Sequence, residues 1–123
     1  MTEQIDIPAT ILDMADVPLP SWVEGRSLVP LMQGNSLPPR PVFSMALEGQ
    51  AIQGQKIAAG KFAIWEGDYK LIYQLEEEKS LLFNLKTDPG ELNNLFYKEH
   101  DMGQNFLSII KMNLQKANER IIE

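Results

Sequence analysis

The residues of this chain that could do chemistry are few and far apart. Asp6, Asp13 and Asp16 stand near the N-terminus, and His100 is the single histidine. Carboxylates that gather in space bind hard cations such as calcium, and histidine is the commonest general acid or base. Asp6 and Asp13 are separated by about two helical turns, and His100 lies in a polar stretch. Structural roles are therefore favoured: Asp6 as a helix N-cap and His100 as an exposed side chain.

Two further charged positions have a functional alternative. Lys70 falls in the run YKLIY, where strand alternation puts it on one face with Ile72, so we favour a lysine lying along the strand surface. The alternative is a contact to an anionic ligand. The acidic run 76–78 is most simply a solvated turn, with calcium binding as its alternative. Trp65 and Tyr73 are predicted to pack in the core rather than to serve as sugar-binding platforms.

Composition narrows the function classes. Seventeen acidic residues against eleven basic ones give a formal charge of −6, which disfavours nucleic acid as a partner. The absence of cysteine excludes disulfides, thiolate metal sites and a cysteine nucleophile. No apolar run approaches the roughly 20 residues that span a bilayer, so no membrane contact is expected. Residues 1–6 do not resemble a signal peptide, and localisation is left open because sequence could precede Met1.

The pattern of apolar residues predicts an α+β fold. A helix is expected at residues 7–15, a short helix starting at Ser27 and ending at Gly34, and a strand at 41–47. Residues 48–60, with three glycines, suggest a long loop with possible strand pieces. The runs 62–65 and 69–73, joined by a short link containing Gly67, predict a hairpin, and 81–85 a further strand. A long C-terminal helix follows from one apolar face, formed by Phe106, Ile110, Leu114, Ala117 and Ile121. We expect a small antiparallel sheet of about four strands with this helix packed on it.

Four short motifs, in this order, resemble the C-terminal part of the sulfatase family. Residues 6–16 (DIPATILDMAD) are similar to the family's Asp-Ile-x-Pro-Thr stretch, and residues 25–34 (GRSLVPLMQG) to its Gly-x-Ser-Leu-x-Pro-Leu stretch. Residues 67–72 (GDYKLI) and 82–95 (LFNLKTDPGELNNL) resemble its Gly-x-Tyr-Lys-Leu-Ile and Leu-Tyr-Asp-Leu-x-x-Asp-Pro-x-Glu-x-x-Asn-Leu segments. Together they cover residues 5–95. Ala9, Asp16, Phe83 and Asn84 depart from the pattern and indicate a divergent member.

The resemblance implies that catalysis belongs to a larger N-terminal α/β domain of the alkaline-phosphatase-like superfamily. There a formylglycine hydrate attacks sulfur while calcium neutralises the sulfate oxygens, and those parts would precede Met1. This chain alone is therefore expected to hold no catalytic residue and no metal. The family's C-terminal subdomain can border the substrate cleft, and the candidates for cleft contacts here are Arg40, Glu48 and Lys70.

A literal match to the formylglycine motif Ser-x-Pro-x-Arg occurs at residues 36–40. The sequence continues into a strand where the family has a Leu-Thr-Gly element, and no adjacent pair of aspartates accompanies it. We therefore interpret it as a proline-rich surface loop.

The resemblance also predicts a division of the chain. Residues 1–34 would be the end of the catalytic-domain region, and residues 35–123 the C-terminal subdomain. The expected partner is the N-terminal catalytic domain. Without it, the apolar face of the first helix predicts a homodimer or an exchanged helix. Two alternatives stay open: a phosphodiesterase or phosphonate hydrolase of the same superfamily as the parent, and a stand-alone interaction module.

Overall fold

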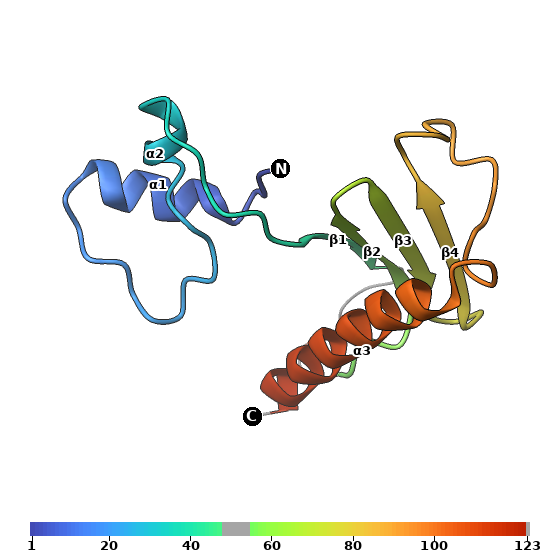
Figure 1. Ribbon diagram of the computed structural model, residues 1–123. Coiled ribbons are helices and arrows are strands. Elements are labelled where there is room, and N and C mark those ends of the chain that lie inside the picture. The colour runs from blue at the N-terminus through green and yellow to red at the C-terminus, as the bar shows by residue number, and fades with distance from the viewer. Residues whose placement is uncertain (48–54, 123) are drawn as a thin grey trace. The chain divides into compact units, whose positions relative to one another are not determined.

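The computed structural model describes residues 1–47 and 55–122, which form two compact units, one of residues 1–42 and one beginning at Phe43 (Figure 1). The predicted boundary after Gly34 separates the end of a catalytic domain from a C-terminal subdomain, and this boundary stays a prediction.

The N-terminal unit contains the predicted first helix. Helix α1 spans Asp6–Met14 and so confirms the expected helix to within one residue at each end. The predicted cap is wrong, because Asp6 is the first helical residue and Ile5, in the cap position, makes no side-chain cap bond. The Asp6 carboxylate is bound by groups outside α1 instead. Helix α1 ends where Asp16 adopts a left-handed backbone with φ of 57°.

A second, short helix α2 spans Val29–Met32 and packs against α1. Ser27 lies two residues before it and accepts a hydrogen bond from the Val29 amide at 3.1 Å, although Leu28 occupies the cap position. Gly34, with φ of 83°, follows α2 as predicted for a helix stop. Among residues 1–42, all of which are described, Ala9 is the only buried apolar side chain. The N-terminal unit therefore has almost no hydrophobic core.

The second unit is a four-stranded antiparallel sheet with strand order β1-β2-β3-β4. The strands span Val42–Leu47, Gly60–Glu66, Tyr69–Gln74 and Lys79–Asn84. The predicted hairpin is β2–β3, in which Glu66 pairs with Tyr69 across Gly67 and Asp68. Gly67 has φ of 59° at the first central position of the turn, where glycine carries no Cβ penalty.

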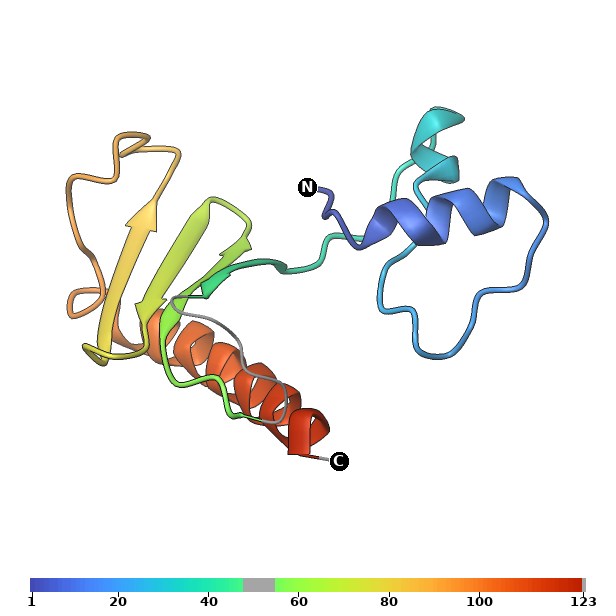
Figure 2. The same ribbon diagram turned by 180° about the vertical axis from the view of Figure 1, so that it is seen from behind.

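Helix α3, His100–Ile122, covers one face of this sheet. It lies in front of the sheet in Figure 1 and behind it in Figure 2. Phe106 and Ile110 are buried against Ile64, Leu71 and Leu82, whereas Ile121 near the helix end is 36% exposed. The expected α+β architecture is confirmed, and contact with the core weakens towards the C-terminal half of α3.

Candidate functional site

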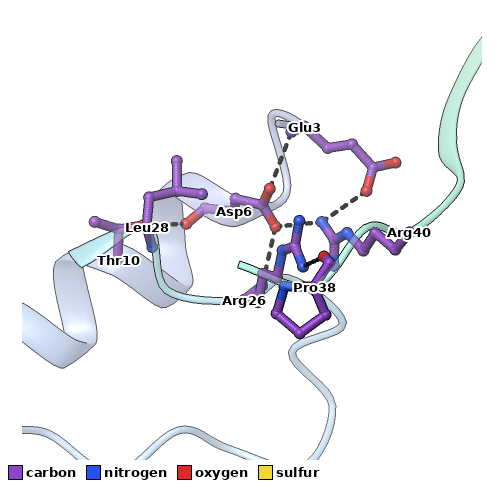
Figure 3. Close-up of polar contacts among 7 residues, drawn as sticks. All are labelled: Glu3, Asp6, Thr10, Arg26, Leu28, Pro38 and Arg40. Carbon is purple, nitrogen blue, oxygen red and sulfur yellow. Dashed lines mark hydrogen bonds and ion pairs between the residues drawn. The ribbon is translucent and has the colours of Figure 1, made fainter. Parts of the chain in front are cut away.

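Asp6, at the start of α1, is a fully buried charged side chain with several polar partners (Figure 3). Its carboxylate accepts hydrogen bonds from the amide of Glu3 at 3.0 Å and from the amide of Arg26 at 2.9 Å. The Arg40 guanidinium donates to the same carboxylate and also pairs with Glu3 at 2.7 Å. Burial of this charge is thus compensated by several donors and one cation.

Neighbouring contacts extend this Asp6 cluster to the loops before α2 and after it. The Arg26 guanidinium donates to the carbonyl oxygen of Pro38 at 2.5 Å. The Thr10 hydroxyl donates to the carbonyl of Asp6 at 2.7 Å and accepts from the Leu28 amide at 3.0 Å. In a unit with almost no apolar core, these polar contacts hold α1 to the segments around residues 26–28 and 38–40.

Gly25 allows one of these segments to approach α1. A Cβ atom at this position would lie 1.8 Å from the carbonyl oxygen of Ile5. Glycine therefore brings the Arg26 amide within reach of the Asp6 carboxylate.

The charged state of Asp6 is favoured by its surroundings. Burial opposes ionisation, but the amides of Arg26 and Glu3 and the guanidinium of Arg40 outweigh it, so the pKa of Asp6 lies below its ordinary value of 3.8. A carboxyl whose pKa is lower in the folded protein stabilises the fold above its unfolded pKa. That stabilisation is lost as the pH falls through the folded value.

We therefore expect the N-terminal unit to loosen on acidification. Amide resonances of α1 and of residues 25–28 should hold their folded positions above about pH 5 and change as the pH falls below the ordinary pKa of an aspartate. Titration of an Asp6→Asn variant is the matched control, because it lacks the titrating group. The same acid-induced change in wild type and Asp6→Asn would contradict this role of Asp6.

Lys70, another of the predicted cleft contacts, lies on β3 with acidic and aromatic partners. Its Nζ is 2.7 Å from an Oε atom of Glu91 and 5.1 Å from the centre of the Trp65 ring. Trp65 and Lys70 are also direct cross-strand partners in the β2–β3 hairpin. Glu91 has a left-handed backbone with φ of 55°, an uncommon conformation for glutamate. Lys70 thus ties the loop after β4 to strand β3.

The remaining candidates from the sequence are Arg40, Glu48, Ser36 and His100. Glu48 lies outside the described residues. Arg40 belongs to the Asp6 cluster, so its cleft-facing role, like that of Lys70, stays a prediction. Ser36 lies on an exposed loop, and the arginine of its motif is Arg40, already paired with Asp6 and Glu3. His100 is the first residue of α3 and is exposed.

The predicted aspartate positions do not gather into a cation site. Asp6 is bound by Arg40, and Asp13 accepts a hydrogen bond from the Ser27 hydroxyl. Within residues 1–47 and 55–122 no three side chains of the kind that ligate metals (His, Cys, Asp, Glu) lie together. The described residues therefore do not fit the calcium site that the resemblance implies for the parent. None of the described helices is both long and apolar enough to span a bilayer.

Comparison with protein families matches residues 1–120 to the family described as "N-sulphoglucosamine sulphohydrolase, C-terminal". This chain belongs to that family. The resemblance to the C-terminal part of sulfatases is thereby confirmed.

The relatives are much longer than this chain. An N-acetylglucosamine-6-O-sulfatase of Bacteroides thetaiotaomicron is 29% identical over 99 residues, which are 76% of this chain and 17% of that protein. The chain spans between 17% and 44% of the lengths of the curated relatives it matches.

Solved structures share the fold at low sequence identity. A protein in complex with its substrate D-glucosamine-2-N,6-O-disulfate matches with a TM-score of 0.69 at 23% identity, over 94% of this chain and 24% of that one. A phosphonate monoester hydrolase from Silicibacter pomeroyi matches with a TM-score of 0.68 at 22% identity, with the same coverages. At such identities the likeness shows the fold alone.

Proposed function

We propose that this chain is the C-terminal part of a sulfuric ester hydrolase, where it serves as scaffold and borders the substrate cleft. The family match over residues 1–120 carries the proposal. The named curated relatives, an N-acetylglucosamine-6-O-sulfatase and an arylsulfatase K of Xenopus laevis, support the reaction class.

By itself the chain is proposed to be inactive. Ester cleavage of this kind needs an activated nucleophile and clustered oxygen ligands for a cation. The resemblance assigns formylglycine and calcium to a preceding α/β domain, and the described residues contain no matching cluster.

The partner that the proposal requires is that α/β domain, and α1 offers a surface for it. Ile7, Ile11 and Met14 are 53%, 60% and 66% exposed, although each is apolar. Burying such a side chain stabilises an association by about 1.5–3 kcal/mol. Ala9 is the only apolar side chain that this unit buries. The exposed apolar face of α1 is therefore larger than the apolar surface that α1 buries within the unit.

The test combines the 123-residue chain with a separately produced α/β domain from the same protein. The chain alone should not turn over an aryl sulfate, and the mixture should. Ile11→Asp should weaken association with the domain, and hence activity at limiting concentration, at least about tenfold. Met112→Asp is the matched control, because Met112 is 49% exposed on α3 in the other unit.

Turnover by the chain alone, or equal losses in Ile11→Asp and Met112→Asp, would contradict this proposal. Sedimentation of the chain without the domain tests whether the same face of α1 pairs two copies: Ile11→Asp should then abolish the dimer. A stand-alone interaction module would be indicated if the chain binds no α/β domain.

The second candidate is a phosphonate hydrolase as the parent, supported by the fold shared with the Silicibacter pomeroyi enzyme. The same mixture separates the two reactions when it is given a phenyl phosphonate ester and an aryl sulfate side by side. A preference for the phosphonate ester would favour this candidate.

A further inference from the structure

The two edges of the four-stranded sheet differ in how their backbone groups are used. In an antiparallel sheet, alternate residues of an edge strand point their N–H and C=O groups away from the sheet, where a further strand can pair with them. On β4 these residues are Ser80, Leu82 and Asn84, whose backbone groups form hydrogen bonds with residues that follow the strand. The chain after β4 returns alongside this edge in both views (Figures 1 and 2).

The Asn94 side chain occupies the centre of the β4 edge. Its Oδ1 atom accepts a hydrogen bond from the Leu82 amide at 2.9 Å, and its Nδ2 atom donates to the Ser80 carbonyl at 3.3 Å. The next residue continues the pattern, because the Leu95 amide donates to the Leu82 carbonyl at 2.7 Å. An asparagine side chain carries a donor and an acceptor like those of a peptide group, so Asn94 takes the place of a fifth strand. We call residues 94–96 the edge strap.

Both sides of the edge strap are anchored. Before it, the Asn84 carbonyl accepts a hydrogen bond from the Asp88 amide at 2.8 Å. At its end, the Phe96 amide donates to Oδ1 of Asn94 at 3.0 Å, and the Phe96 ring is buried in the core. A Cβ atom at Gly103 on α3 would lie 2.8 Å from this ring, so the glycine allows α3 to hold Phe96 closely.

Strand β1, at the opposite end of the strand order, is an edge of the kind that accepts further strands. Its sequence VFSMAL contains no charged residue and no proline, two of the features by which natural edges resist pairing. Five of its six residues are exposed, and Met45 is 61% exposed. An open β4 edge would therefore find a suitable strand in β1 of another copy. Because β1 and β4 are different surfaces, such pairing repeats from copy to copy without closing.

We propose that the edge strap, through Asn94, prevents a second copy of this chain from extending the sheet at β4. With the strap in place, the Leu82 and Ser80 groups that a foreign strand would need are already hydrogen-bonded. Without the Asn94 side chain, two of the three hydrogen bonds at the centre of this edge are lost, and β4 can pair with β1 of another copy. This role is independent of the proposed ester hydrolysis.

The test compares Asn94→Ala with Asn93→Ala, the same change at an exposed neighbour. Hydrogen exchange of the Leu82 amide should become at least about tenfold faster in Asn94→Ala, while the Leu71 amide in the central strand β3 keeps its rate. In analytical ultracentrifugation, Asn94→Ala should form species that grow with concentration beyond the size of the wild type, and Asn93→Ala should not. An Asn94→Ala variant that sediments like the wild type, or whose Leu82 exchange is unchanged, would overturn the proposal.

Two matched methionine replacements separate edge pairing from general aggregation. In the Asn94→Ala background, Met45→Lys puts a charge on the β1 edge and should return the sedimentation to that of the wild type. Met112→Lys makes the same change on α3, where Met112 is 49% exposed, and should leave the larger species in place. If both lysines disperse the larger species, or if neither does, the association does not run through β1 and the proposal is wrong.

Discussion

Replacing Asp6 by asparagine should destabilise the N-terminal unit by about 2–4 kcal/mol while the second unit stays folded. Removing one partner of a buried ion pair costs roughly 3–5 kcal/mol, and the lower range applies here because the Arg40 side chain keeps 24% exposure. Asparagine is nearly isosteric, but it removes the charge that compensates Arg40 and loses part of the acceptor capacity that the amides of Glu3 and Arg26 use. Hydrogen exchange of α1 amides, compared with β3 amides in the same sample, measures the effect.

The control for this prediction is Asp16→Asn. Asp16 is exposed at the end of α1 with a left-handed backbone, which asparagine also adopts, so its replacement should change stability by no more than about 0.5 kcal/mol. If both variants lose α1 protection equally, net charge rather than the Asp6 cluster controls the unit. If β3 protection falls in Asp6→Asn as well, the two units do not unfold independently.

The elements of the fold were predictable because each rests on local rules. The spacing of Phe106, Ile110 and Leu114 encodes one face of a helix, and the Gly67 link encodes a tight turn between β-rich runs. Burial of Phe106 and Ile110 by the sheet follows from that face. The same local reasoning gave α1 correctly to within one residue.

The polar contacts were not predictable from local rules. Asp6 resembles a helix cap in sequence, yet its partners Arg26 and Arg40 are 20 and 34 residues away, in loops without periodicity. Lys70 likewise pairs with Glu91, 21 residues along the chain. The glutamate of the Asp-Pro-Gly-Glu turn and the arginine after Gly25 were visible in the motifs, but a motif does not state which opposite charge it contacts. Tertiary structure decides such pairs.

Replacing Leu71 by alanine should cost the second unit about 3–5 kcal/mol. Leu71 is fully buried at the centre of β3, and its cross-strand partners Ile64 and Leu82 are fully buried too. Because neighbours on both sides are fixed in the sheet, the cavity cannot close, and costs of this size follow from the removed methyl groups plus the residual void. Small domains are stable by only about 5–15 kcal/mol, so the variant loses a large part of its stability. Urea unfolding followed by the fluorescence of Trp65 on β2 measures it.

Leu92→Ala is the control, with the same chemical change at a side chain that is 84% exposed in the loop after β4. It should alter stability by about 0.5 kcal/mol or less, because no cavity forms and little apolar area returns to water. Trp22, in the other unit, is 78% exposed and contributes a nearly constant signal to both titrations. Equal destabilisation by the two replacements would mean that Leu92 is covered in solution. The sheet and α3 would then not be the whole core of this unit, because the loop after β4 would pack into it as well.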